Sequence, residues 1–317
     1  MKTTEENNHR TIFDDVFRTM EEKMPQFIIP VINEVFGTSY SEEEAVECLR
    51  NEHITPSGRI ITDSCFKIQK FLYHVECQSS PDYAMTIRMV EYDFAIALDR
   101  VEKKNGLYEM NFPHSSVLYL RHNRNTSDEL KMKVNLPNGE SFFYTTPIIK
   151  VQDYTKDEIF QKNLIWFLPY YIMKYEKHLE EIKQNPEKMQ AFLYEFEDIQ
   201  NKLEKQLEGE GNTVFFTELI ELIMEVSNYI LQSEKELQER MGMIMGGKVL
   251  ELRTDKLLAQ GLQQGLQKGE NKFARLVSRL LTDGRMQDIG IVAEDVEVRK
   301  EFYKMYGITD EVEKELP

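Results

Sequence analysis

Apolar residues near the start of the chain recur at helical spacing. In Thr11–Glu22 they fall three and four residues apart, and Thr11 stands where a capping side chain is needed. The apolar run Phe27–Phe36 predicts a second helix, which Gly37 should end. Ser41–Glu44, a serine followed by three glutamates, is typical of the start of a third helix.

The pattern then changes to short runs of β-branched and aromatic residues. Ile60–Ile68 and Phe71–Ser79 are two such runs with only Gln69 and Lys70 between them, so they predict an antiparallel hairpin. A helix to about Arg100 should follow, because apolar residues return there to helical spacing. Further strands are expected at Ser115–His122, Leu130–Leu136, Ser141–Thr145 and Pro147–Val151.

From Lys156 the pattern is helical almost throughout. Pro169 should bend the first of these helices, and the pair of glycines at Gly246 should interrupt a long one. The expected helices are Asp157–Tyr175, Pro186–Leu207, one from Thr213 or Thr217 to Leu231, a stretch from Ser233 to Leu281, Met286–Ala293 and Val296–Tyr306. The chain is therefore expected to be α/β over residues 1–155 and mainly α-helical over residues 156–317.

Gly261, Gly265 and Gly269 form a repeat with one glycine every four residues. Each glycine costs a helix about 1 kcal/mol relative to alanine. Such a glycine face allows another helix to approach closely, which favours self-association, and a weakly helical connector is the alternative. The intervening glutamines and lysine exclude a membrane-spanning helix.

Composition and charge narrow the class of protein. The formal net charge of −16 argues against a protein that coats nucleic acid with its whole surface, although opposite charges nearly balance between positions 53 and 133. The three cysteines form no C-x-x-C pair, which indicates a reducing cytoplasm rather than a disulfide framework. No signal peptide is visible, and glutamates interrupt the best apolar run, Val214–Leu231, so no contact with a membrane is expected.

The predicted hairpin carries the candidate chemistry. Alternation places Asp63 and Lys67 on one face of the first run, and His74, Glu76 and Gln78 on one face of the second. Carboxylates on adjacent strands that point to the same side can hold a divalent cation. Mg²⁺ prefers oxygen ligands and accepts a site with one or two carboxylates.

Four motifs occur in an order that resembles a known family. Asp63 followed by Glu76-Cys77-Gln78 is similar to the core of the PD-(D/E)XK nuclease superfamily in its E-x-Q form. The segments Asp14–Arg18 and Arg88–Tyr92 resemble the D-x-x-F-[KR] and R-x-x-x-Y helices of the Rpn family of recombination-promoting nucleases and putative transposases. The glycine repeat resembles that family's C-terminal repeat.

The resemblance implies a restriction-endonuclease-like core, in which helices flank a mixed central sheet. It implies that Asp63 and Glu76 hold Mg²⁺, with Mn²⁺ as a substitute, together with the backbone carbonyl of Cys77 and with Asp14. Gln78 would orient the attacking water, although a lysine is commoner at this position.

Four other residues near these motifs have expected roles. Arg88 could pair with Glu76 or Asp14, or could reach a phosphate, and Tyr92 would support the site. Lys67 would contact phosphate or solvent. His74 is interpreted as a supporting or surface residue rather than a ligand, because Mg²⁺ prefers oxygen.

Two functions follow from these observations. The first is a cytoplasmic Mg²⁺-dependent DNA endonuclease that hydrolyses phosphodiester bonds, linked by the resemblance to mobile elements, recombination or phage defence. The second is a catalytically inactive helical assembly protein or DNA-associated interaction protein, which could form homo-oligomers through its C-terminal helices. Asp14, Asp63 and Glu76 favour the first function, whereas Gln78 and the acidic charge favour the second.

Overall fold

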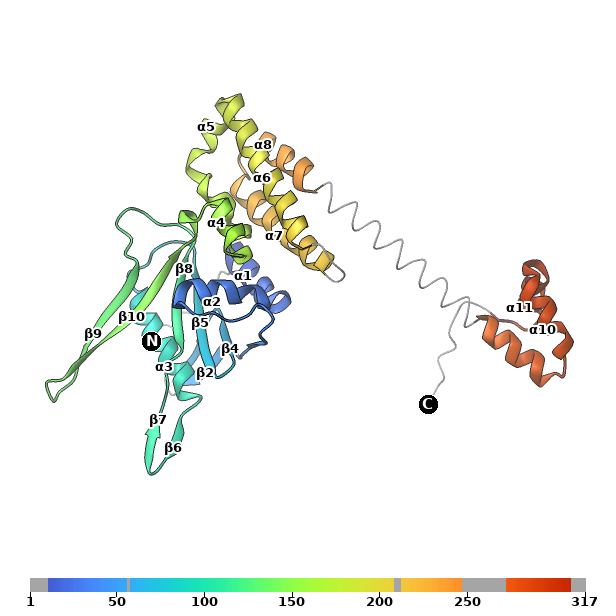
Figure 1. Ribbon diagram of the computed structural model, residues 1–317, viewed down its shortest axis with the longest axis horizontal. Coiled ribbons are helices and arrows are strands. Elements are labelled where there is room, and N and C mark those ends of the chain that lie inside the picture. Colours follow the sequence, from blue (N-terminus) through green and yellow to red (C-terminus); the bar gives the residue numbers. More distant parts are fainter. Residues whose placement is uncertain (1–10, 56–57, 208–211, 247–271, 309–317) are drawn as a thin grey trace, which may run out of the picture. The chain divides into compact units, whose positions relative to one another are not determined.

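The computed structural model describes residues 11–55, 58–207, 212–246 and 272–308. The chain divides into two compact units, Met1–Val249 and Leu250–Pro317. The expected boundary between residues 155 and 156 lies inside the first unit, where strands give way to helices. The fold is α/β, with a mixed central sheet (Figure 1).

Two helices open the first unit as the sequence predicts. Helix α1 (Ile12–Lys23) begins with a capping box in which Thr11 and Asp14 satisfy each other's backbone amides. A 3₁₀ turn, η1 (Pro25–Phe27), leads to α2 (Ile28–Phe36). Gly37 ends α2 with a φ of 64°, a left-handed conformation that glycine adopts without steric cost.

The central sheet has six strands in the order β1-β4-β5-β8-β10-β9. Its strands are β1 (Val46–Cys48), β4 (Cys65–Ile68), β5 (Phe71–Gln78), β8 (His114–Tyr119), β9 (Glu129–Asn135) and β10 (Ser141–Lys150). The pairs β5–β8 and β8–β10 are parallel, and the other three pairs are antiparallel. The sheet is therefore mixed, as expected.

Three of the sequence predictions about strands and helix starts are wrong. Ser41–Glu44 forms turns rather than a helix, because the chain beyond it pairs as β1 with β4. The run Ile60–Ile68 is broken into β3 (Gly58–Ile61), which pairs with β2 (Glu52–Thr55), and β4. The two strands expected on either side of Thr146 are one strand, β10, which exchanges β9 for β8 near Pro147.

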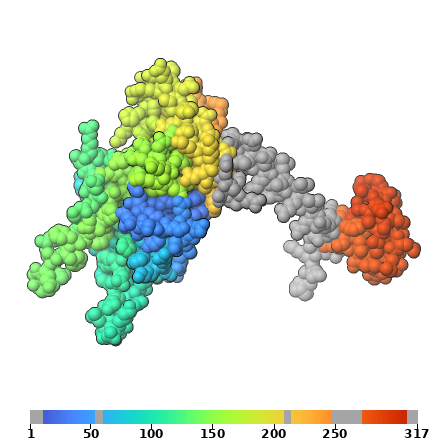
Figure 2. Space-filling view, in the orientation of Figure 1, coloured from blue at the N-terminus to red at the C-terminus, as the bar shows by residue number. Residues whose placement is uncertain are grey.

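Helices cover both faces of the sheet. On one face, Phe17 of α1 and Phe66 of β4 both pack edge-on against Trp166, with ring centroids 5.7 and 6.3 Å away. On the other face lies α3 (Met85–Leu98), whose Met85 and Met89 form a buried cluster with the strands β8 and β10. The hairpins β6–β7 (Glu102–Lys104 and Leu107–Glu109) and β9–β10 project from this core (Figures 1 and 2).

The rest of the first unit is helical. The predicted helix Asp157–Tyr175 is instead α4 (Lys156–Gln161) followed by the 3₁₀ helix η3 (Ile165–Lys174). The break falls at Asn163, whose φ is 55°, and Pro169 inside η3 lacks the N–H that an α-helix needs. The remaining elements are η4 (Glu176–His178), α5 (Leu179–Gln184), α6 (Pro186–Gln206), α7 (Asn212–Ile230), α8 (Lys235–Met241) and the π-helical turn η5 (Gly242–Gly246).

The second unit has a small core of its own. A helix over residues 272–282 packs with α10 (Met286–Glu294) and α11 (Val296–Met305) around the buried residues Leu276, Leu280 and Val292. The predicted terminal helix pair is confirmed, whereas the glycine repeat at 261–269 lies outside the described residues. None of the helices within the described ranges is long and apolar enough to cross a membrane.

Candidate functional site

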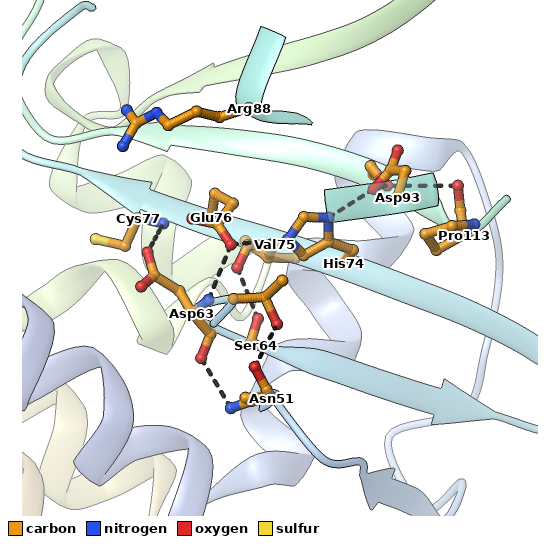
Figure 3. A network of polar contacts seen from close by, with 12 residues as sticks. Asn51, Asp63, Ser64, His74, Val75, Glu76, Cys77, Arg88, Asp93 and Pro113 are labelled. Carbon is orange, nitrogen blue, oxygen red and sulfur yellow. Dashed lines mark hydrogen bonds and ion pairs between the residues drawn. The ribbon is translucent and has the colours of Figure 1, made fainter. Parts of the chain in front are cut away.

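Asp63 and Glu76 meet at the end of β5 (Figure 3). Asp63 lies in a bend just before β4, where its backbone N–H donates a hydrogen bond of 2.8 Å to Oε1 of Glu76. The N–H of Cys77 donates in turn to Oδ2 of Asp63, over 2.9 Å. Cys65 pairs with His74 in the antiparallel ladder. Asp63, two residues before Cys65, therefore comes opposite Glu76, two residues after His74, and the two carboxylates lie together.

The surroundings of Asp63 hold the pKa of its carboxyl group well above the usual value. Burial is the largest cause, and the negative charge of Glu76, a hydrogen bond between the two carboxyl groups and the charge of Asp14 act in the same direction. The N–H of Cys77 opposes them. Two acidic groups in such proximity disfavour their joint ionisation, and a cation between them would remove that conflict.

His74 holds Glu76 from the interior of the protein. Its side chain is fully buried, with Nε2 at 2.8 Å from Oε1 of Glu76 and Nδ1 at 2.7 Å from Oδ1 of Asp93. Burial opposes a charge on the ring, but the hydrogen bonds to Asp93 and Glu76 outweigh it and raise the pKa of His74 to about 10. His74 is therefore an imidazolium that donates to both carboxylates, a supporting residue and not a surface one.

Asp93, which none of the sequence motifs includes, completes the buried network. It is 1% exposed and accepts hydrogen bonds from Ser115 Oγ (2.7 Å) and Tyr144 OH (2.5 Å) as well as facing His74. Its place on α3 offers a sequence signal: it stands four residues after Met89, on the helix face that otherwise carries buried apolar side chains. A carboxylate at such a position needs partners from neighbouring strands.

Gln78 is bound by Arg88. Nη2 of Arg88 lies 3.1 Å from Oε1 of Gln78 and 3.0 Å from Oδ2 of Asp82. The structure therefore pairs Arg88 with Asp82, and not with Glu76 or Asp14. The contact holds the Gln78 amide by its oxygen, and its NH₂ group makes no hydrogen bond within the described residues.

Tyr92 and Lys67 differ in their relation to the site. Tyr92 packs edge-on against His74, with ring centroids 6.0 Å apart, and burial followed by the charge of Glu76 raises its pKa. Lys67 is instead ion-paired with Glu47 of β1 at 2.9 Å. It stands four residues after Asp63 along the chain, roughly 13 Å away in an extended strand. Lys67 is not brought to the carboxylates.

Asp14 is near the site but has another task. Its Oδ2 accepts the N–H of Thr11 at 2.8 Å, within the capping box of α1. It is still close enough to affect the pKa of Asp63. Within the described parts of the chain, no group of three or more His, Cys, Asp or Glu side chains is arranged to hold a metal ion. The donor set that remains is Asp63 and Glu76 with the backbone at Cys77, which fits Mg²⁺ if water supplies the other ligands.

A second pair of residues supports the bend at Asp63. Nδ2 of Asn51 donates to the backbone carbonyl of Asp63 over 3.0 Å and to Oε2 of Glu21 over 3.1 Å. Glu21 is 4% exposed, and burial raises its pKa to about 7 despite the hydrogen bond from Asn51. Neither residue belongs to a sequence motif, because Asn51 reaches Asp63 through its backbone carbonyl.

Comparison of the chain with protein-family models, with curated proteins and with solved structures found no match.

Proposed function

We propose that this protein is a Mg²⁺-dependent DNA endonuclease that hydrolyses phosphodiester bonds and has a PD-(D/E)XK core. The observation that carries the proposal is the meeting of Asp63 and Glu76, each held by a fixed donor, Cys77 N–H for Asp63 and His74 for Glu76. The order of helix, carboxylate hairpin, helix and parallel strand supports it. The resemblance in motifs links the activity to mobile elements, recombination or phage defence.

The chain's own residues would divide the work as follows. Asp63 and Glu76 hold the metal ion, which when bound activates a water molecule and stabilises charge on the phosphate. His74 keeps Glu76 in place through its hydrogen bond. Gln78 positions the water through its NH₂ group, since Arg88 occupies its oxygen. Gln78 has no titratable group, so it acts by orientation and does not accept the proton.

The test compares two carboxylates of the central sheet, Glu76 on β5 and Glu47 on β1, two strands that β4 separates. Purified protein should cut plasmid DNA with Mg²⁺ and not with EDTA. The cleavage rate of Glu76→Ala should be at least ~10²-fold lower than that of the parent, the scale expected when a group that organises transition-state charge is removed. Glu47→Gln is the matched control, because Glu47 is an exposed carboxylate that pairs only with Lys67 in the described structure. Full activity in Glu76→Ala would identify a contaminating nuclease and defeat the proposal.

Metal binding is measured separately from cutting. Mg²⁺ or Mn²⁺ should raise the melting temperature of the parent, because the ion binds the folded state, and Asp63→Asn should abolish the rise. An equal rise in Asp63→Asn would place the ion elsewhere.

A second candidate is a non-catalytic assembly or DNA-associated protein. It is favoured by the lack of a third acidic or histidine ligand within the described residues and by the charge of −16. It predicts no metal-dependent rise in melting temperature. It also predicts self-association through the C-terminal helices, which light scattering of the full chain would detect.

A further inference from the structure

A cavity of about 450 Å³ adjoins the candidate site. Tyr119 of β8, which lines it, is the ladder partner of Gln78, so both side chains lie on the α3 face of the sheet. Asp82, also in the lining, is the ion-pair partner of Arg88, which holds Gln78. Adjacent strands are ~5 Å apart, and Glu76 lies two residues, ~7 Å, before Gln78 on β5. The cavity therefore begins about one nucleotide from the carboxylates.

The lining is mixed, with somewhat more apolar than polar surface, and it carries little charge. Tyr83 stands fully exposed at the cavity, and Tyr119 is 2% exposed within it. Amide and hydroxyl side chains line another wall, at Thr86, Asn123 and Asn125. Asp82 is the one charged residue in the described lining, and Arg88 offsets it. Such a cavity suits an uncharged planar group with polar edges better than it suits a phosphate.

The loop after β8 is held in shape by its own hydrogen bonds. Oδ1 of Asn123 accepts the N–H of Asn125 over 2.8 Å, and Oγ1 of Thr126 accepts the N–H of Asn123 over 3.1 Å. The Nδ2 group of Asn123 and the whole side-chain amide of Asn125 make no hydrogen bond within the described residues. These amides can donate to and accept from the edge of a ligand, and the loop backbone that carries them is held by the two hydrogen bonds.

We propose that this cavity binds an unpaired base of a DNA strand, next to the phosphodiester bond that the site cleaves. The inference rests on the proposed nuclease function and narrows its substrate. A base would stack on Tyr83 and present its edge to Asn123 and Asn125, as single strands do on aromatic and amide side chains. A base inside a duplex is stacked and paired, and it would have to flip out at a cost of a few kcal/mol. Single strands and sites with unpaired nucleotides are therefore the preferred substrates.

The experiment measures binding of the full chain in EDTA, without cutting. The probes are a fluorescent 20-nucleotide single strand, its complete duplex, and the duplex with one unpaired nucleotide. The parent should bind the single strand and the interrupted duplex about 10-fold more tightly than the complete duplex, the scale of base–aromatic stacking. Tyr83→Ala should remove this preference and Tyr83→Phe should restore it, because stacking needs only the ring.

Tyr108 supplies the matched control, because it is an exposed tyrosine, 67% accessible, on the β6–β7 hairpin. Tyr108→Ala should bind all three probes as the parent does. Tyr83 is exposed, so its substitutions should leave the fold intact. Equal affinities of the parent for the three probes, or a preference that survives in Tyr83→Ala, would overturn the inference.

A second arm separates a strand from a free nucleotide. A deoxynucleoside monophosphate should compete with the single strand only weakly. Competition at equal concentrations would show a free-nucleotide site and overturn the assignment. The two proposals can fail separately. If the parent cuts DNA and Tyr83→Ala binds the three probes as the parent does, only this inference is refuted. If binding depends on Tyr83 but the parent cuts no DNA, the cavity proposal is supported and the nuclease proposal is refuted.

Discussion

Asp93→Asn tests the buried network behind Glu76. Asparagine keeps the shape of the side chain and can still accept hydrogen bonds from His74 and Ser115. Its NH₂ group would face Tyr144, whose hydroxyl can rotate to accept. The substitution therefore removes the charge of Asp93 and leaves most of the geometry. The imidazolium of His74 then has Glu76 as its only carboxylate partner.

The expected cost is about 3 kcal/mol of unfolding free energy. Breaking a buried ion pair costs ~3–5 kcal/mol, and the remaining partner, Glu76, places this case at the lower end. The pKa of His74 gives a consistent figure: a rise from 6.5 to about 10 corresponds to roughly 5 kcal/mol, shared between the two carboxylates. Tyr144→Phe, which removes one hydrogen bond to the buried Asp93 carboxylate, should cost about 2 kcal/mol.

The assay is urea unfolding followed by the fluorescence of Trp166. It is the one tryptophan of the chain, is 0% exposed, and lies in the unit that contains the network. The midpoint should fall with an unchanged slope. In the double variant with His74→Gln the two costs should be less than additive by at least ~1 kcal/mol, because the residues are in contact.

The contribution of the His74 ion pair to stability depends on pH. The pKa of His74 is raised in the folded state, so its stabilising contribution is complete below about 6.5 and is lost as the pH rises through about 10. The difference between the parent and Asp93→Asn should therefore shrink between pH 7 and pH 10. A difference that is constant over this range, or a cost below ~0.5 kcal/mol with additive behaviour, would refute the ion pair.

Other substitutions test the supports of the site. Burial raises the pKa of Glu21 to about 7, so its contribution to stability is complete below pH 4.5 and is lost as the pH rises through 7. Between pH 4.5 and pH 8 the unfolding free energy of Glu21→Gln, measured with urea, should therefore rise by up to ~3 kcal/mol relative to that of the parent. No such relative rise would contradict the burial of Glu21. Gln69 has a φ of 55°, so Gln69→Gly should stabilise by ~0.5–1 kcal/mol in the same assay, and destabilisation would argue against this turn. Gln78→Ala should lose DNA cleavage yet keep the Mg²⁺-dependent rise in melting temperature, and loss of both would make Gln78 part of the metal site. Lys67→Ala should cut DNA within about twofold of the parent, because its exposed pair with Glu47 is distant from the carboxylates; a larger loss would give it a role with substrate.

The sequence predicted well those helices and strands whose ends carry capping residues, glycine or proline, and those whose faces show a regular apolar pattern. The capping residues of α1, the glycine after α2 and the proline that opens α6 all lie where expected, because each satisfies a local requirement of the backbone. Alternation also predicted that Asp63 and Glu76 share one side of the hairpin, which requires only a two-residue period and a short turn.

Tertiary contacts decided what the pattern missed. Ser41–Glu44 has the sequence of a helix start, but pairing of β1 with β4 gives the following residues extended partners that local propensity does not reveal. Asp63 is in a bend rather than a strand, since its N–H and its backbone carbonyl bind the side chains of Glu76 and Asn51. The partners of Asp93 come from β5, β8 and β10, and their convergence depends on the crossover of the sheet.

The turn between β4 and β5 has a consequence for chain length. Only Gln69 and Lys70 lie between the paired residues Ile68 and Phe71, and this spacing sets the β4–β5 register that brings Asp63, just before β4, opposite Glu76. One inserted residue would shift that pairing by one position and turn the side chains of β4 to the opposite face. Insertions at this turn should therefore separate the carboxylates, whereas the tips of the β6–β7 and β9–β10 hairpins can lengthen without moving either one.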